Sequence, residues 1–254
     1  MKKQRISVQA ETLKYVEKNK SKLKSAVKKY TACTTQNTIP DLKEVKTNIE
    51  VVGMDTLGAT IYFQEKLKKK FAFLVMANPT NPGGGYKDGS PAQEESICRR
   101  TNLVQCINSV KYPIPEFGGI YIRDIHIIRD HEKNKYEFFK SPYVSNCVLC
   151  CAYSNPLTKN DKLETKYRNN TKLKIEAMFN ILLENGNTNI ILSAFGCGAF
   201  GNPPKDMAEI FLEVINSENY KNKFENIIFA IIKDAWFANY ATFTDVLTKS
   251  NNGK

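Results

Sequence analysis

Residues 71–95, FAFLVMANPTNPGGGYKDGSPAQEE, join a continuous apolar run to a polar segment that is rich in glycine. The run FAFLVMA (71–77) contains no polar side chain, which is typical of a strand buried on both faces of a parallel sheet. Three consecutive glycines at 83–85 let a ligand approach the main chain closely. Two adjacent acids, Glu94 and Glu95, follow. This stretch predicts an α/β fold with a site beyond the end of the strand.

The residues just before the two acids have the pattern of a helix start. Ser90 suits the N-cap, Pro91 the first helical position and Gln93 the third, which predicts a helix from about 91 to 110. Neighbouring helical residues point about 100° apart, so the two carboxylates are expected to play different parts. Acids in a first turn also complement the helix dipole, and that explanation stays open. The dipole favours a carboxylate, whereas burial or a bound anion changes the pKa of a general acid.

Strands and helices alternate along most of the remaining chain. Further strands are predicted at 48–53, 119–128, 136–139, 144–154, 189–195 and 226–236, and further helices at 56–70, 172–185 and 205–216. RDHEKNK (129–135) has the pattern of a hairpin turn between two of those strands. Such alternation predicts a mostly parallel mixed sheet with helices on both faces, a three-layer α/β/α arrangement. Ligands of such sheets bind beyond the carboxyl ends of the strands.

A second glycine-rich loop follows the strand predicted at 189–195. It reads Gly196-Cys197-Gly198-Ala199-Phe200-Gly201-Asn202, and Pro203 and a helix come next. Asn202 suits an N-cap, and glycine turns that feed a helix start bind phosphate through backbone N–H groups. A turn that needs glycine only for packing is the alternative.

The same glycines match the G-x-G-x-x-G fingerprint of nicotinamide-dependent dehydrogenases. That fingerprint also needs an acidic residue about 20 positions further on, at the end of the next strand. The next predicted strand places Asp234 far beyond that spacing, and Glu213 falls in a helix. The spacing therefore disfavours a dehydrogenase.

The charge of the chain is concentrated at its start. The 254 residues have a net charge of +11, yet residues 1–30 alone carry ten Lys or Arg against two acids. Leu13, Val16, Leu23 and Val27 have a rough helical spacing among them, so we predict an N-terminal helical extension (1–45) packed on a single catalytic domain (46–254). A nucleic-acid partner for residues 1–30 has weak support because only Tyr15 and Tyr30 interleave with the lysines.

Cysteine usage and hydropathy limit the class of protein. Seven cysteines, an odd number, and a start too charged for a signal peptide predict reduced thiols in an intracellular, cytoplasmic protein, with a nuclear or host-cell compartment as the alternative. No run approaches the about 18 apolar residues of a spanning helix, so we expect no membrane span. We also expect a monomer. The group Cys147-x-x-Cys150-Cys151 suggests zinc, but it lies in an apolar strand and the chain has only two histidines. We therefore expect neither a metal nor a cofactor.

Together, GGG-YKDGSPA-QEE (83–95) and SAFGCGAFGNPP (193–204) resemble the bacterial, or microbial-type, poly(ADP-ribose) glycohydrolases, a branch of the macrodomain fold. RISVQAETLKYVEKN, IEVVGMDTL, QEESICRRTNLVQCI and FENIIFAIIKD extend the resemblance over most of residues 5–235. It implies a macrodomain-like enzyme that hydrolyses poly(ADP-ribose) from chain ends, with ADP-ribosylated proteins as partners and ADP-ribose as product.

The resemblance also implies roles for single residues. Glu95 would be the catalytic acid, Glu94 would hold ribose hydroxyls, and Gln93 would support the loop. Asn78 would contact the distal ribose, and Asp55 is a candidate adenine contact by loop position. The ADP-ribose diphosphate and riboses would be lined by Gly83, Gly84, Gly85, Gly196, Cys197, Gly198, Ala199, Phe200, Gly201 and Asn202, with Phe200 against a ribose. A mono-ADP-ribosyl hydrolase and a non-hydrolysing reader of ADP-ribose remain alternatives.

Overall fold

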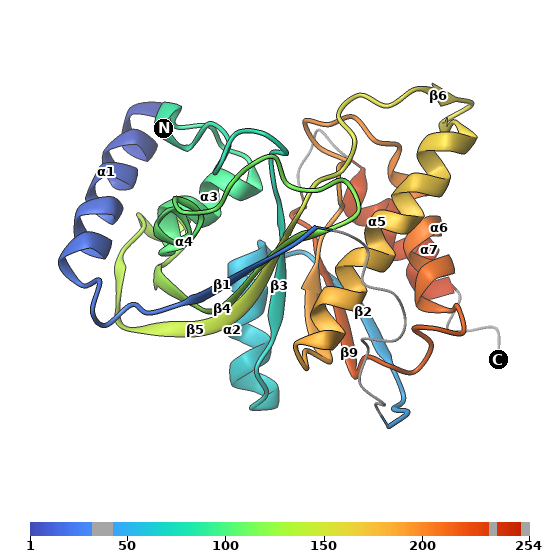
Figure 1. The fold of residues 1–254 in the computed structure, drawn as a ribbon, viewed down its shortest axis with the longest axis horizontal. Helices are drawn as coiled ribbons and strands as arrows, with labels where there is room; N and C mark the ends of the chain where they lie inside the picture. Colours follow the sequence, from blue (N-terminus) through green and yellow to red (C-terminus); the bar gives the residue numbers. More distant parts are fainter. Residues whose placement is uncertain (32–42, 234–237, 250–254) are drawn as a thin grey trace.

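The computed structural model describes residues 1–31, 43–233 and 238–249. Its centre is a seven-stranded sheet in the order β1-β4-β5-β3-β8-β9-β2 (Figure 1). The strands, in that order, are Ala26–Tyr30, Gly119–Arg129, Phe138–Cys150, Ala72–Met76, Asn189–Leu192, Asn226–Ala230 and Asn48–Val52. The five strands from β5 to β2 run parallel, whereas β1 with β4 and β4 with β5 are antiparallel. The mostly parallel mixed sheet predicted from the sequence is confirmed.

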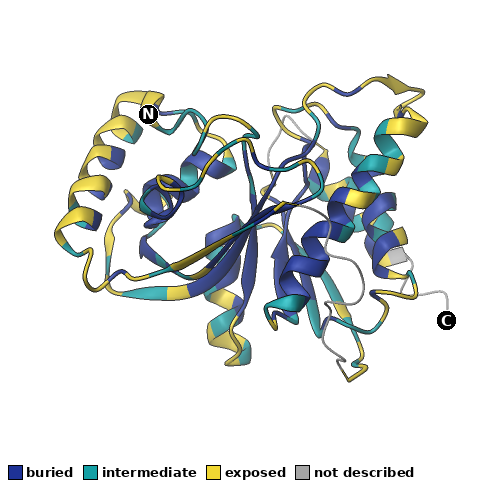
Figure 2. Cartoon of the chain, viewed as in Figure 1, coloured by how far each residue is buried: buried dark blue, intermediate teal, exposed yellow. Residues whose placement is uncertain are grey.

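Helices cover both faces of this sheet, as the three-layer prediction requires. On one face lie α2 (Thr56–Leu67), α3 (Gln93–Arg100) and α4 (Leu103–Ile107). On the other lie α5 (Thr165–Glu184), α6 (Pro204–Ile215) and α7 (Asn239–Lys249). The central strands β3, β8 and β9 are buried almost throughout (Figure 2). Short elements complete the chain: η2 (Tyr86–Asp88), η3 (Glu132–Asn134), β6 (Thr158–Lys159) and β7 (Lys162–Leu163).

The N-terminal segment differs from the prediction because only its first part is helical. Helix α1 (Lys2–Lys18) ends before Asn19, and Val27 lies in β1, an edge strand paired with β4. Most of β1 is exposed and carries lysines, so its sequence resembles the polar face of a helix. Val16 and Leu23 are buried with Ile128, which packs the segment onto the hairpin of β4 and β5.

Three other boundaries also differ. The predicted helix at 91–110 is interrupted at Thr101, which is extended and forms a bridge with Ile127. The two strands predicted at 136–139 and 144–154 are one strand, β5, whose first half pairs with β4 alone because β3 joins only at Asn146. Pro142 is tolerated on that exposed half since a free edge needs no N–H donor. Residues 234–236 of the last predicted strand lie outside the described residues.

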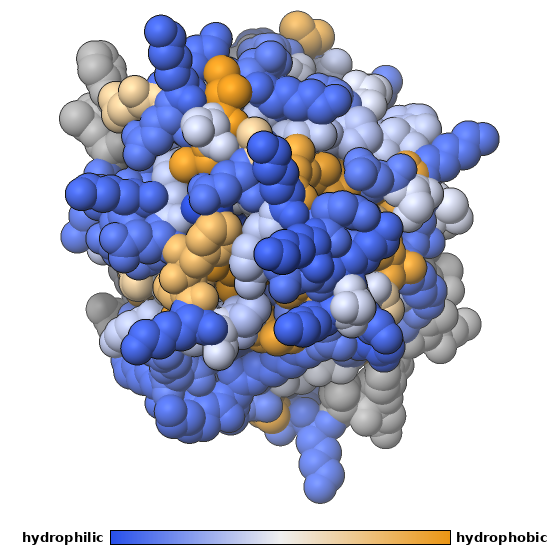
Figure 3. All heavy atoms as spheres, turned by 90° about the vertical axis from the view of Figure 1, so that its left-hand side faces the viewer, coloured by the Kyte–Doolittle hydropathy of each residue, from blue (hydrophilic) through white to orange (hydrophobic). Residues whose placement is uncertain are grey.

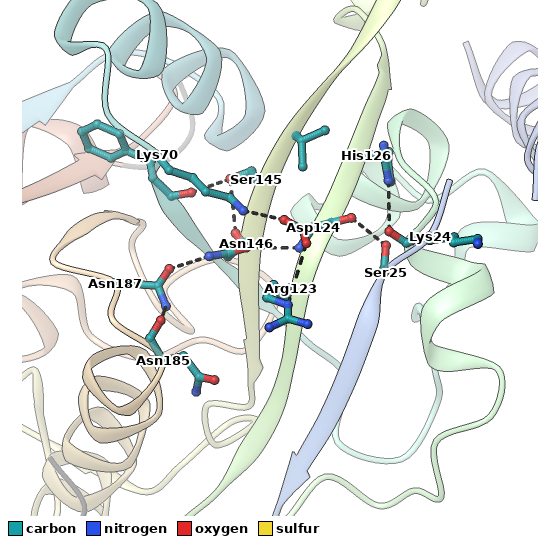
Figure 4. A network of polar contacts seen from close by, with 12 residues as sticks. Lys24, Ser25, Lys70, Arg123, Asp124, His126, Ser145, Asn146, Asn185 and Asn187 are labelled. Atoms are coloured by element: carbon teal, nitrogen blue, oxygen red, sulfur yellow. Dashed lines mark hydrogen bonds and ion pairs between the residues drawn. The ribbon is translucent and has the colours of Figure 1, made fainter. Parts of the chain in front are cut away.

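A buried polar network lies at the amino-terminal ends of the parallel strands, opposite their carboxyl ends. The Asn146 side chain accepts from the Asp124 N–H (3.1 Å) and donates to Asn187 Oδ1 (2.7 Å), as Figure 4 shows. Asn187 in turn donates to the hydroxyl of Tyr121 (3.0 Å). Asp124 has φ +60° at the bulge of β4. The network ties that bulge to β5 and to the chain leading into β8.

Candidate active site

The two glycine-rich loops leave neighbouring strands at the same edge of the sheet. Strands β3 and β8 are parallel and pair through Ala72 and Phe73, so the loops that follow them start side by side (Figure 1). The loop after β3 leads into α3, and the loop after β8 leads into α6. The topology therefore brings together the two segments that carry the predicted site.

Helix α3 starts later than the sequence predicts. Its N-cap is Ala92 and its first residue is Gln93, so Ser90 and Pro91 lie in the preceding loop. The Ser90 carbonyl accepts from the buried guanidinium of Arg99 (2.8 Å), and its side chain packs against Gly85. That carbonyl contact shapes the loop in place of a side-chain cap. Glu94 and Glu95 still fall in the first turn, as predicted.

The backbone of the glycine loop encloses both carboxylates. Glu94 Oε2 accepts from the Asn78 N–H (2.8 Å), and Glu94 Oε1 accepts from the Gly83 N–H (3.1 Å). Glu95 Oε1 accepts from the Gly85 N–H (2.8 Å). Glu95 Oε2 is buried and has no hydrogen-bond partner among the described residues. Glu94 thus uses both oxygens to hold the loop, whereas Glu95 keeps one oxygen available for another group.

Gly84 stands at the point where the two carboxylates meet. Its φ of +57° is in the left-handed region. A Cβ there would lie 2.4 Å from Glu95 Oε1 and 3.2 Å from Glu94 Oε2. Both oxygens therefore lie within 3.2 Å of one point. Only glycine allows the loop to close over the pair at this distance.

Burial of this acidic pair holds a proton near neutral pH. Burial and, to a smaller extent, the nearby Glu95 carboxylate raise the pKa of Glu94 to about 8, although the Asn78 and Gly83 N–H groups oppose the shift. At this position burial outweighs the helix dipole. The retained proton therefore lies on Glu94, next to Glu95, because both carboxylates approach the same point over Gly84.

The Gln93 side chain joins the start of α3 to the central sheet and to α2, whereas the resemblance implies a role in supporting the loop. Its Oε1 accepts from the Met76 N–H (2.8 Å), and its Nε2 donates to the Leu74 carbonyl (2.7 Å) and to Thr56 Oγ1 (3.0 Å). Pairing of β3 with β8 has already ended at Phe73. The Gln93 amide therefore takes the place of a neighbouring strand and fixes the start of α3 against β3 and α2.

The second loop presents free backbone donors. Gly198 and Ala199 are exposed, and their N–H groups have no hydrogen-bond partner among the described residues. The loop is braced from inside, where Gly201 N–H donates to the Gly198 carbonyl (3.0 Å) and Phe200 accepts from the Asn155 N–H (2.8 Å). Phe200 is half-buried. Free N–H groups before a helix start suit an anion.

Asn202 is not the helix cap that the sequence predicts, and Cys197 faces the interior. The N-cap of α6 is Pro203, whereas the Asn202 amide donates to the carbonyls of Tyr153 (2.7 Å), Gly196 (3.1 Å) and Phe200 (3.2 Å). Asn202 therefore closes the loop on itself. The Cys197 thiol points inward and burial raises its pKa, so this residue offers backbone and not sulfur to the loop surface.

Asn78 and Asp55 flank the acidic pair, and both side chains have partners. Asn78 Oδ1 accepts from the N–H groups of Thr80 (3.0 Å) and Asn81 (2.8 Å), which folds the start of the glycine loop. Asp55 caps α2 and forms an ion pair with the buried Arg100 (2.5 Å). Burial would raise the pKa of Asp55, but the Arg100 guanidinium lowers it below its usual value.

Sequence reasoning missed two residues near the site, the buried Arg100 and the half-buried Tyr112. Arg100 is 1% exposed and joins α3 to the cap of α2 through Asp55. Tyr112 has a buried hydroxyl without a partner among the described residues, and burial and the Glu94 charge raise its pKa. A basic residue in a helix normally indicates a solvated face, so the sequence carried no signal for Arg100. Tyr112 lies in an irregular segment without a motif.

No group of three or more potential metal ligands lies within the parts of the chain that the structure describes. The six cysteines among these residues are free and buried; Cys33 lies outside them. Cys147 and Cys150 lie in β5, so the predicted strand placement is confirmed. None of the described helices is long and apolar enough to cross a membrane.

Comparison with known proteins relates this geometry to a family. Residues 2–117 match the family model described as "Microbial-type PARG, catalytic domain", where PARG denotes poly(ADP-ribose) glycohydrolase. The resemblance seen in the sequence is confirmed. This microbial-type PARG match includes Asp55, Asn78, the three glycines and both glutamates, whereas the loop at 196–202 lies beyond it. No curated protein matches the chain.

Solved bacterial PARG structures share the fold over almost the whole chain. The poly(ADP-ribose) glycohydrolase of Thermomonospora curvata has 19% identity and a TM-score of 0.82, covering 95% of this chain and 98% of its own. The structure of the same enzyme bound to the inhibitor ADP-HPD has 21% identity and a TM-score of 0.75, and it also covers 95% of this chain and 98% of its own. The enzyme of Deinococcus radiodurans in complex with ADP-ribose has 21% identity and a TM-score of 0.75, covering 89% and 95%. These likenesses establish the PARG-type macrodomain fold.

Proposed function

We propose that this protein hydrolyses the ribose–ribose glycosidic bonds of poly(ADP-ribose), mainly from chain ends, and releases ADP-ribose. The observation that carries the proposal is the enclosed acidic pair: Glu95 Oε2 is buried and unpartnered among the described residues, while every other oxygen of the pair is held by a loop N–H group. The match of residues 2–117 to the PARG catalytic domain supports the assignment.

The chemistry follows from the free oxygen. Glu95 donates the proton of the acidic pair to the ribose oxygen that departs, as the bond from that oxygen to the anomeric carbon breaks and leaves an oxocarbenium-like centre. Glu95, now a carboxylate, accepts a proton from water while the water oxygen bonds to the anomeric carbon. The pair ends with the proton it began with. Glu94, both of whose oxygens hold the loop, acts as a positioning residue in this proposal.

The substrate is held by the remaining loops in this proposal. The exposed N–H groups of Gly198 and Ala199 bind the diphosphate of the terminal unit, and Phe200 packs against its ribose. The glycine loop at 83–85 has all three N–H groups bonded within the protein, to Glu94, the Asn81 carbonyl and Glu95. It therefore contacts the distal ribose through its close main-chain surface and not through free donors.

Product analysis on two substrates tests this function. Labelled polymer and a singly ADP-ribosylated protein are incubated with the parent protein, and products are separated by length. The proposal predicts ADP-ribose as the first product from polymer. Oligomers as first products would contradict chain-end cleavage. Faster release from the singly modified protein would favour a mono-ADP-ribosyl hydrolase, and tight ADP-ribose binding without any release would identify a reader.

A further inference from the structure

Exposed lysines lie at both ends of α1, and the first end lies beside the loop that leads to the glutamates. Lys2, Lys3, Lys14 and Lys18 are exposed, and none of them has an ion pair among the described residues. The two acids of the helix are both paired: Glu11 with Arg129 (2.6 Å) and Glu17 with Lys20 (3.7 Å). We define these four lysines as the α1 face.

The α1 face is fixed relative to the active site. Gln9 Nε2 donates to the Cys98 carbonyl (3.3 Å) and Thr12 Oγ1 donates to the Arg99 carbonyl (2.7 Å), so α1 binds the last turn of α3, the helix that carries the glutamates. Arg5 adds an ion pair with Glu132 (2.9 Å). The helix is therefore a rigid platform and not a loose basic tail.

The first turn of α1 lies against the loop between the glycines and the glutamates. A Cβ at Gly89 would lie 2.7 Å from the Lys2 carbonyl oxygen and 3.0 Å from Ile6 Cγ1. Lys87, exposed in η2, stands between the glycine loop and this turn. The seventeen residues of α1 then extend about 25 Å away from the site, so Lys14 and Lys18 lie farther from it than Lys2 and Lys3. Figure 3 faces this end of the molecule and shows a mostly hydrophilic surface with separate apolar patches.

We propose that the α1 face binds the part of a poly(ADP-ribose) chain that extends beyond the active site. The inference rests on the proposed function and deepens it, because it assigns a surface that distinguishes long polymer from a single ADP-ribose unit. Each unit of the polymer carries a diphosphate, and the exposed lysines at the two ends of α1 offer positive charge to such groups. Binding of this kind releases counterions and weakens as salt rises.

Charge reversal on the face tests the proposal against a matched control. Lys3→Glu/Lys14→Glu is compared with Lys66→Glu/Lys221→Glu, which makes the same charge change at exposed lysines outside α1, on α2 and in the segment between α6 and β9. Steady-state rates are measured on long polymer and on a two-unit oligomer at low and high salt. For the α1 variant we expect KM on long polymer to rise about tenfold at low salt and much less at high salt. Its kcat, and its KM on the oligomer, should change less than twofold.

Three results would overturn the proposal. The α1 variant and the control could behave alike, or KM could rise equally on both substrates. The third is that the α1 variant binds duplex DNA more weakly than the parent does while its KM for polymer is unchanged. That result would assign the face to nucleic acid. A parent protein that cleaves neither substrate would instead contradict the proposed function. Filter binding of long polymer by the same variants then still decides whether the α1 face binds it.

Discussion

At the scale of single residues, the site depends on how closely the main chain approaches the two carboxylates. Gly84→Ala places a Cβ 2.4 Å from Glu95 Oε1 at a φ of +57°. We expect kcat/KM on polymer to fall at least about 50-fold, and the free energy of unfolding to fall by about 1–2 kcal/mol for the left-handed backbone. Rates and urea unfolding measure the two effects. Gly198→Ala, whose Cβ meets nothing within 4 Å, should unfold like the parent.

The proton of the acidic pair sets a pH limit on activity. Because the pKa of Glu94 is raised to about 8, the pair loses its proton as pH rises through that value, and kcat/KM should decline above it. The same shift affects stability. A carboxyl that is harder to ionise when folded stabilises the protein most below its unfolded pKa, and this contribution is lost as pH rises towards 8. Rates that stay constant from pH 7 to 10 would contradict this view of the pair.

At the scale of elements, α1 acts as a support for α3. Thr12→Val removes the hydroxyl that donates to the Arg99 carbonyl while keeping the volume of the side chain. We expect a loss of about 1 kcal/mol in unfolding free energy and a lower kcat with little change in KM. Ser7→Val, at an exposed position of the same helix, controls for helix propensity. Equal effects of the two substitutions would show that α1 does not position α3.

Elements that local sequence determines could be predicted, whereas elements that depend on distant partners could not. Buried parallel strands such as β3 and β8 are marked by continuous apolar runs, and the glycine loops by the positions that need a close or left-handed main chain. The break at Thr101 and the strand β1 depend on tertiary partners, Ile127 and β4, which local sequence does not report. The predicted Ser90 cap is wrong because α3 starts at Gln93, and the predicted Asn202 cap is wrong because its side chain binds carbonyls of its own loop.

At the scale of the whole molecule, the site and the buried network around Asn146 lie at opposite ends of the parallel strands. Asn146→Leu would leave the Asp124 N–H and Asn187 Oδ1 without their partners (Figure 4). We expect a loss of about 2–4 kcal/mol in unfolding free energy, because unsatisfied buried groups are costly. KM and kcat at low temperature should stay within about twofold of the parent, since sites this far apart rarely couple. A selective loss of kcat in a stable variant would contradict this separation.

The whole architecture leads to one central claim, that Glu95 delivers the proton which breaks the polymer. Glu95→Gln keeps an oxygen for the Gly85 N–H but carries no acidic proton. The decisive measurement is the rate of ADP-ribose release from polymer, with ADP-ribose binding measured by calorimetry as the control for an intact site. We expect a fall of about 100-fold or more with binding retained. Release at the parent rate would contradict a role of Glu95 as the proton donor.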